Sequence, residues 1–212
     1  MNTNITAIAL AACAASGLAS VSNGSFESGT GADADNWNEI EIAGGSLGAS
    51  AVADRTTSNV HTGDYAMMLS VTGAGDFGPV AEIQQQTAVG SVSAGQEYDF
   101  SFFAMGTPGP GSVAFYEVLF FDGDGSNGGG PQGSSGLQTF ALNASYTEIS
   151  FSGLVAPAGA DSVLIQIRLV TGAFDGAAGE AFIDDVSFNL VPTPAAAALL
   201  GMGGLVATRR RR

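Results

Sequence analysis

From Leu47 onwards the sequence alternates short apolar runs with clusters of Gly, Pro, Asp, Asn and Ser. This rhythm predicts many short β-strands joined by turns. Between the two termini no segment keeps a 3.6-residue apolar period for three turns, which argues against a helical domain. We expect strands near residues 49–53, 65–72, 79–86, 96–105, 113–121, 146–151, 162–170 and 181–189.

Two of these expected strands alternate strictly between apolar and polar residues. One face carries Tyr98, Phe100, Phe102 and Ala104, and one face of the other strand carries Val163, Ile165, Ile167 and Leu169. Successive side chains of a strand point to opposite faces, so each strand is half-buried, as in an antiparallel sandwich. The expected fold class is all-β, a two-sheet antiparallel β-sandwich (jelly roll). An immunoglobulin-like sandwich is the alternative, disfavoured because its cysteine pair is absent.

The charge distribution excludes nucleic acid as a partner. All twenty acidic residues lie between Glu27 and Asp185, where Arg55 and Arg168 are the basic residues, giving a formal charge of −18. Such a surface repels phosphate backbones but suits divalent cations. His61 is the single histidine, and no phosphate loop, zinc spacing or dinucleotide fingerprint occurs, so we do not expect an enzyme.

Both ends of the chain are typical of targeting segments. Residues 1–20 have an apolar core and small residues near Ala19, as in a secretory signal, although positive residues are missing at the start. The true start therefore lies upstream or the signal is atypical. Cys13 matches a lipobox, with filling of the apolar signal core as the favoured alternative. We expect the domain at 22–190 and a sorting or anchor segment at 191–212.

The carboxyl-terminal segment has three parts in a fixed order. A proline turn is followed by an apolar run, which we expect to be a short hydrophobic helix, and by terminal arginines: Pro192, Thr193, Pro194, then 195–208, then Arg209, Arg210, Arg211 and Arg212. A helix of fourteen residues spans about 21 Å, short of the ~30 Å hydrocarbon core, and arginines remain cytoplasmic.

This order resembles the PEP-CTERM sorting signal, with Thr193 where many members have glutamate. The resemblance implies transient anchoring in the inner membrane and cleavage by an exosortase-type transpeptidase. It implies an exported protein of the cell envelope, cell surface or extracellular matrix. A plain tail anchor is the alternative.

Five pieces of the central region resemble, in order, the jelly-roll carbohydrate-binding modules of the CBM4/9/22 kind: NGSFES, HTGDYAMML, SAGQEYDFSFFAMG, YEVLFFDGDG and AFIDDVSF. The resemblance implies a β-jelly roll with a structural calcium ion and, in some members, a sugar along the concave sheet.

Candidate calcium ligands are oxygens brought together from both ends of the domain. We expect Glu27 and Asp184 or Asp185 to bind Ca²⁺, with Asp184 as the first choice. The resemblance implies that backbone oxygens near Thr62 and Gly63 complete the site. Alternation places Asp184 on a face with the apolar residues of the last strand, where a carboxylate needs a cation or strong donors. The alternative is that backbone amides satisfy Asp184.

A second possible metal loop contains Asp122 and Asp124, but the later glutamate of an EF-hand is missing, which favours a polar hairpin loop.

Candidate glycan-binding residues are polar or aromatic side chains that we expect to point outward: Gln84, Gln86, Tyr116, Gln166 and Arg168. The alternative is that they form an ordinary solvated face. Two functions remain open. The first is a calcium-stabilised structural or matrix protein that associates with exopolysaccharide. The second is a dedicated glycan-binding module with a specific carbohydrate ligand.

Overall fold

The computed structural model describes residues 19–43, 48–75, 78–125 and 127–192, which form two main antiparallel sheets packed as a β-sandwich. The six-stranded sheet has the order β10-β8-β12-β6-β3, with β9 also paired to β8. Its strands are β3 (Asn38–Ile42), β6 (Val80–Gln86), β8 (Ser112–Asp122), β9 (Gly130–Ser134), β10 (Gln138–Phe140) and β12 (Ser162–Thr171).

The five-stranded sheet has the order β11-β7-β13-β5-β4. Its strands are β4 (Ser50–Thr56), β5 (Ala66–Thr72), β7 (Glu97–Thr107), β11 (Thr147–Val155) and β13 (Ala178–Leu190). A separate two-stranded ribbon pairs β1 (Gly29–Thr30) with β2 (Asp33–Ala34). The all-β sandwich is confirmed, and each of the eight expected strands is found.

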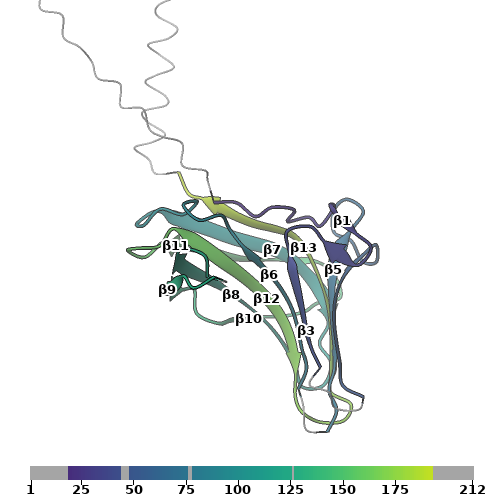
Figure 1. Cartoon of the computed structure of the whole chain (residues 1–212). Helices are drawn as coiled ribbons and strands as arrows, with labels where there is room; N and C mark the ends of the chain where they lie inside the picture. Colours follow the sequence, from purple (N-terminus) through teal and green to yellow (C-terminus); the bar gives the residue numbers. More distant parts are fainter. Residues whose placement is uncertain (1–18, 44–47, 76–77, 126, 193–212) are drawn as a thin grey trace, which may run out of the picture.

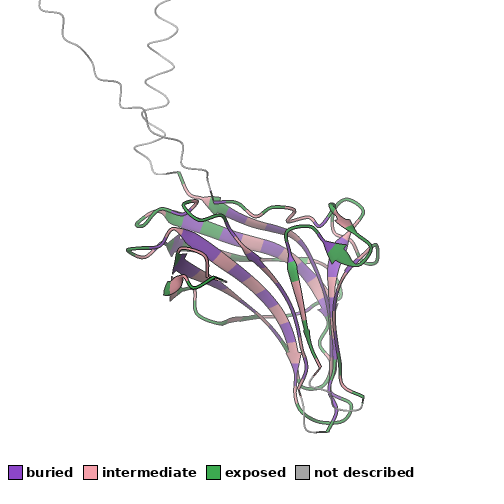
Figure 2. Cartoon of the chain, viewed as in Figure 1, coloured by how far each residue is buried: buried purple, intermediate pink, exposed green. Residues whose placement is uncertain are grey.

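The core lies between the two sheets and is built by the predicted alternation. Val163, Ile165, Ile167 and Leu169 of β12 are fully buried, while the residues between them are half-buried. Figure 2 shows this alternation as purple and pink bands along β12. The aromatic face of β7 supplies the opposite wall of the core, and Phe100 and Phe102 contact Tyr116 of β8 at ring-centroid distances of 5.3 and 5.6 Å.

Both sheets curve in the same direction, with the six-stranded sheet on the inside of the bend (Figure 1). The face of this sheet that points away from the core is therefore concave. We call it the concave face. It consists of the outward residues of β3, β6, β8 and β12.

The two targeting predictions fall almost wholly outside the described residues, which omit 1–18 and 193–212 and with them the expected terminal helix. Ala19, at the end of the predicted leader, packs in the core with 2% of its surface exposed. None of the described residues forms a helix long and apolar enough to cross a bilayer.

Candidate glycan-binding face

A row of four polar side chains crosses the middle of the concave face. The strand register places Glu117 of β8 beside Gln166 of β12, Gln166 beside Gln84 of β6, and Gln84 beside Asn38 of β3. Adjacent strands lie about 4.8 Å apart, so this polar row is about 14 Å long. Gln166 Nε2 donates a hydrogen bond to Gln84 Oε1 at 3.1 Å, which orders the two amides in the centre. The amides in this row can both donate to and accept from sugar hydroxyls, and the carboxylate of Glu117 can accept from them.

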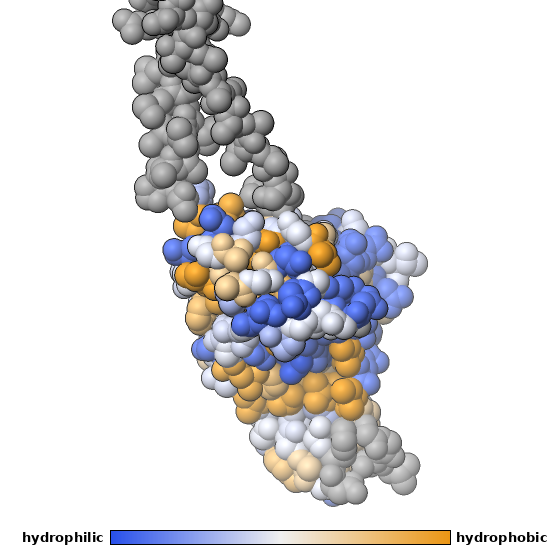
Figure 3. All heavy atoms as spheres, turned by 60° about the vertical axis from the view of Figure 1, so that its left-hand side comes forward, coloured by the Kyte–Doolittle hydropathy of each residue, from blue (hydrophilic) through white to orange (hydrophobic). Residues whose placement is uncertain are grey.

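Apolar side chains flank the polar row along the strands. Leu119 and Leu164 are paired on one side, and a row of Val113, Val170, Val80 and Ile42 lies further along on the other side. In Figure 3 a band of hydrophilic residues crosses the molecule above a row of hydrophobic ones. The face therefore offers hydrogen-bonding groups between apolar strips, which matches the alternating hydroxyl edges and C–H faces of a sugar chain.

The polar row ends in a hollow of about 370 Å³, lined by residues that include Trp37, Asn38, Gln84, Gln86 and Leu164. Trp37 is the single tryptophan of the chain, and its Nε1 donates to the Asn23 carbonyl at 2.9 Å. Gln86 Nε2 donates to Ser162 Oγ at 2.8 Å, while its buried Oε1 accepts no hydrogen bond from any described residue. The hollow thus continues the amide-rich surface towards β3.

Arg168 lies beside the polar row and is held by a carboxylate of the neighbouring strand. Its Nε lies 2.7 Å from Glu82 Oε2, and its Nη2 donates to Glu82 Oε1 at 3.1 Å. The guanidinium carbon is 5.8 Å from the centre of the Phe115 ring. The ion pair and the Nη2 hydrogen bond hold the guanidinium on the concave face.

Four of the five predicted glycan-binding residues share the concave face, namely Gln84, Gln86, Gln166 and Arg168. The outward position expected for Tyr116 is wrong. Tyr116 pairs with Ile167 and is 4% exposed, packed among Phe100, Phe102 and Phe140 in the core. Burial also raises its pKa. Because β8 is apolar on both faces, the sequence alone did not show which face is buried.

Sequence reasoning missed Asn38, Glu82 and Glu117. Asn38 belongs to a strand that was not expected. Glu117 is the one charged residue between Ser112 and Phe121, and this could have marked it as outward-facing. Glu82 is 4% exposed, which nothing in its sequence context indicates.

The predicted calcium ligands gather around one loop, residues 61–65. Asp184 Oδ2 accepts hydrogen bonds from the backbone N–H groups of His61 and Thr62 at 2.9 and 3.1 Å, and its Oδ1 accepts from Asp185 N–H at 2.8 Å. Glu27 Oε1 accepts from the N–H groups of Asp64 and Tyr65 at 3.0 and 3.1 Å. The loop therefore joins the first segment of the domain to its last strand through backbone amides.

Asp184 does not lie on the core face as expected. It pairs with Phe103 on the outer side of the five-stranded sheet, whereas Ile183 beside it faces the core. A β-bulge between Asp184 and Ser187, with Asp185 at φ 48°, shifts the alternation so that Phe188 returns to the core. Asp184 is nevertheless completely buried. This burial raises the pKa of its carboxyl group, against the opposing effect of the amide hydrogen bonds.

Asp185 is satisfied by side chains instead of amides. His61 Nδ1 lies 2.7 Å from Asp185 Oδ2, and Thr62 Oγ1 donates to Asp185 Oδ1 at 2.7 Å. The His61 ring stacks on Phe103 at 3.9 Å, with Tyr146 5.0 Å away. Burial, followed by the nearby Asp184 and Asp185 carboxylates, raises the pKa of Tyr146.

These contacts account for the three carboxylates through N–H and O–H donors. Among the described residues no three His, Cys, Asp or Glu side chains are grouped to hold a metal ion. The arrangement of Glu27, Asp184 and Asp185 with the loop amides therefore does not by itself fit a cation, and calcium at this place stays a prediction. The residues near Thr62 and Gly63 direct N–H groups, rather than carbonyl oxygens, at the carboxylates.

The second predicted metal loop connects β8 to β9. Asp122 Oδ1 accepts from Gly130 N–H, and Asp124 Oδ2 accepts from the Asn127 side-chain amide. These bonds close the loop on itself, as the polar-hairpin alternative expects.

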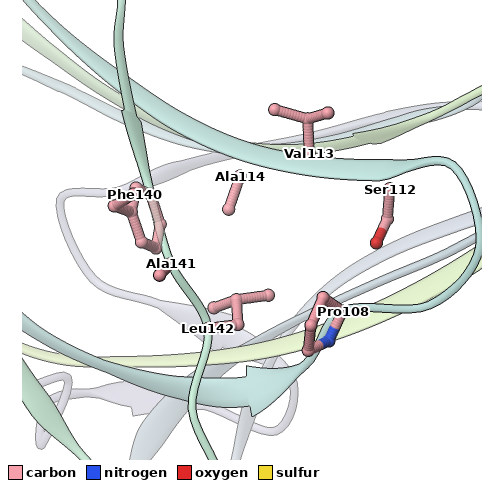
Figure 4. A pocket seen from close by; sticks show the side chains of 7 residues that line it. All are labelled: Pro108, Ser112, Val113, Ala114, Phe140, Ala141 and Leu142. Carbon is pink, nitrogen blue, oxygen red and sulfur yellow. The ribbon is translucent and has the colours of Figure 1, made fainter.

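A different hollow, of about 270 Å³, lies beside the end of β8 (Figure 4). Its lining is apolar except for Ser112, with Val113 and Ala114 on one side and Phe140, Leu142 and Pro108 on the other. A sugar hydroxyl would find few hydrogen-bonding partners in this hollow, and the concave face is the stronger candidate for a glycan site.

Comparison with solved structures shows the same fold in other proteins. The enzymatically active domain of bacteriophage CBA120 tailspike protein 4 aligns with a TM-score of 0.58 and 18% identity, over 82% of this chain and 22% of that one. A carbohydrate-binding module of the β-sandwich superfamily aligns with a TM-score of 0.53 and 15% identity, over 84% and 64%. A CBM4 structure aligns with a TM-score of 0.50 and 20% identity, over 80% and 99%.

This chain thus spans less than two thirds of the first two proteins. No protein-family model and no curated protein matches the sequence. At these identities the likeness concerns the fold, and the chain has the β-sandwich fold found in CBM4-like carbohydrate-binding modules.

Proposed function

We propose that residues 22–190 form a non-catalytic glycan-binding domain whose ligand lies on the concave face. The observation that carries the proposal is the polar row of Glu117, Gln166, Gln84 and Asn38, in register across four strands and flanked by apolar strips. The fold shared with carbohydrate-binding modules supports it. A row about 14 Å long suits an oligosaccharide better than a single sugar.

The same face lacks what glycoside hydrolysis needs. Hydrolysis uses two carboxyl groups on opposite sides of the scissile bond. The carboxylates on the concave face are Glu82 and Glu117. Glu82 is 4% exposed and held by Arg168, so Glu117 remains without a second carboxylate to act with it. Binding without bond cleavage is therefore the function that this face supports.

Intrinsic fluorescence offers a direct test, because the single Trp37 lines the hollow at the end of the polar row. A glycan array would first identify a ligand, and titration would then follow Trp37 emission. Each hydrogen bond contributes about 0.5–1.5 kcal/mol, so Gln166→Ala and Gln84→Ala should each weaken binding by about twofold to twelvefold.

The matched control is Glu148→Ala, on the outer side of the five-stranded sheet, where it pairs with Phe103. It should leave the affinity unchanged. Equal loss in all three variants, or no loss in the glutamine variants, would reject the concave face as the binding site.

We further propose that the protein is exported and sorted to the cell surface or extracellular matrix, where the domain associates with polysaccharide. The support is the sequence of both ends, with Pro192, Thr193 and Pro194 preceding an apolar run and four arginines. Mass spectrometry of the protein from cells tests this: a mature chain ending near the proline turn supports processing by an exosortase-type enzyme, and an intact carboxyl terminus opposes it.

A further inference from the structure

Every basic side chain in the described part of the protein is already engaged. Arg55 donates to the carbonyls of Phe26 and Glu27, and its guanidinium lies 3.2 Å from the centre of the Tyr65 ring. His61 is paired with Asp185, as described above. Arg168 is paired with Glu82, and the sequence contains no lysine. No unengaged cation is therefore available on this surface for an anionic ligand.

Arg168 matters most, because it is the basic residue of the concave face. Glu82 is nearly buried and contacts two nitrogens of the guanidinium, which cancels its charge locally. The Arg168 side chain is only half-buried, so the other N–H groups of its guanidinium can donate to neutral hydroxyls. Glu117 on β8 adds a further negative charge beside Gln166. Arg168 can therefore donate hydrogen bonds on the concave face, although the net charge of that face is negative.

Recognition of a carboxylate, sulfate or phosphate group normally uses an arginine that is free to form a bidentate pair. Here both carboxylate oxygens of Glu82 already contact the Arg168 guanidinium. The domain also carries a formal charge of −18, which repels a polyanion over distances up to the Debye length. The pairing of Arg168 with Glu82 and the negative charge of the domain therefore both weaken the binding of an anionic glycan.

We propose that Glu82 is a specificity-determining residue, which restricts the concave face to uncharged glycans by neutralising Arg168. This proposal rests on the proposed glycan-binding function and adds the residue that sets its selectivity. In this proposal the Arg168–Glu82 pair selects uncharged over anionic glycans, in addition to any stabilisation of the fold that the pair provides.

The test compares one polymer in two charge states. The neutral polymer that binds best on the array is oxidised at its primary hydroxyls to carboxylates, so that backbone and length are retained. Wild-type protein should bind the oxidised polymer at least about tenfold more weakly at low salt, since like charges brought together cost at least about 1.4 kcal/mol. Glu82→Gln, which keeps the shape and leaves the Arg168 charge free, should reduce this ratio by about threefold or more.

The control is Glu148→Gln, which makes the same change in net charge on the other side of the molecule. It should leave the ratio near the wild-type value. An equal change in both variants would show that overall charge, rather than Glu82, sets the preference, and would overturn the proposal.

A second measurement needs no variant and so does not depend on the folding of Glu82→Gln. Raising the salt from about 10 to about 150 mM shortens the Debye length from about 30 to about 8 Å. Wild-type affinity for the oxidised polymer should rise with salt if repulsion excludes it, and a fall would mean that a cation contacts the ligand. Tighter binding of the oxidised than of the neutral polymer would overturn the role of Glu82 but leave glycan binding intact. Absence of binding to either polymer would refute the proposed function itself.

Discussion

Asp184→Asn tests how the last strand is joined to loop 61–65. The buried carboxylate has two oxygens that accept three backbone N–H groups, from His61, Thr62 and Asp185. In asparagine one oxygen becomes an NH₂ group, which cannot accept. One orientation leaves the Asp185 N–H without an acceptor, and the other leaves the N–H groups of His61 and Thr62 without one.

The structure sets the expected size of the effect. A buried donor left unsatisfied costs about 1–3 kcal/mol. Burial raises the pKa of Asp184, so replacing the carboxylate also removes a desolvated charge and offsets part of this cost. We expect a net loss of about 2 kcal/mol at neutral pH, which lowers the Tm of a domain of this size by about 4–8 °C.

Thermal unfolding followed by circular dichroism measures this change. Asp185→Asn is the matched control, because the Asp185 side chain is 25% exposed and water can replace its hydrogen bonds to Thr62 and His61. Asparagine also tolerates the positive φ at this position. We expect the control to cost less than about 1 kcal/mol. Equal losses in the two variants, or a Tm for Asp184→Asn within about 1 °C of wild type, would refute the account.

The same melting curves decide the calcium prediction. If amide donors alone satisfy the carboxylates, a chelator leaves the wild-type Tm unchanged. A calcium-dependent rise in Tm that disappears in Glu27→Gln and Asp184→Asn would instead establish the cation site.

Two further changes probe other parts of the domain. Gly63→Ala should lower the free energy of unfolding by about 2 kcal/mol in denaturant titration, because φ is +71° and the new Cβ would lie 2.2 Å from Glu27 Oε1. Gly90→Ala is the control, with φ +81° and open space around it, and should lower the free energy of unfolding by less. An equal loss in the two variants would contradict the role of the close contact with Glu27. Asp54→Asn should stabilise the protein at pH 7, because burial and the carboxylates of Glu41 and Asp33 raise the Asp54 pKa. A raised folded pKa makes the wild type lose stability as pH rises above the ordinary value of 3.8. The gain in Tm should therefore be present at pH 7 and vanish at low pH, and a gain that is independent of pH would contradict this cause.

The fold followed from the sequence wherever a strand has one apolar and one polar face. β7 and β12 alternate cleanly, and their predicted core residues are buried. β3 was missed because it is only five residues long, with exposed Ile42 facing outward and two glutamates on the other face. Both glutamates accept hydrogen bonds from backbone amides: Glu39 Oε1 from Ala34 N–H and Glu41 Oε1 from Ala53 N–H. Ala34 lies in the β1–β2 ribbon and Ala53 in β4 at the edge of the opposite sheet, so local alternation does not show what these glutamates bind.

The residues of the candidate site were likewise predictable only where their strands alternate regularly. Gln84, Gln86, Gln166 and Arg168 were placed on one face correctly, because their strands alternate. Asp184 was placed on the wrong face because a single bulge changes the phase of β13, and a positive φ at an aspartate leaves no signature in the residue pattern. The charge of Glu117 could have shown that it faces outward, but its place beside Gln166, and that of Asn38 beside Gln84, follow only from the register of the four strands.

Burial on the two outer surfaces of the sandwich gives a reason, independent of structural likeness, for placing a ligand on one of them. On the five-stranded sheet, Phe182 and Asp184 point away from the core yet are only 4% and 0% exposed. Loop 61–65 binds Asp184, and Tyr146 donates to the Asn59 carbonyl, so these segments close over that part of the sheet. On the six-stranded sheet, the equivalent central positions, Gln84 and Gln166, remain half-exposed along a continuous row. A polymer that must contact several strands at once can therefore lie on the concave face, whereas on the opposite face it would first have to displace a loop that is hydrogen-bonded to the buried Asp184.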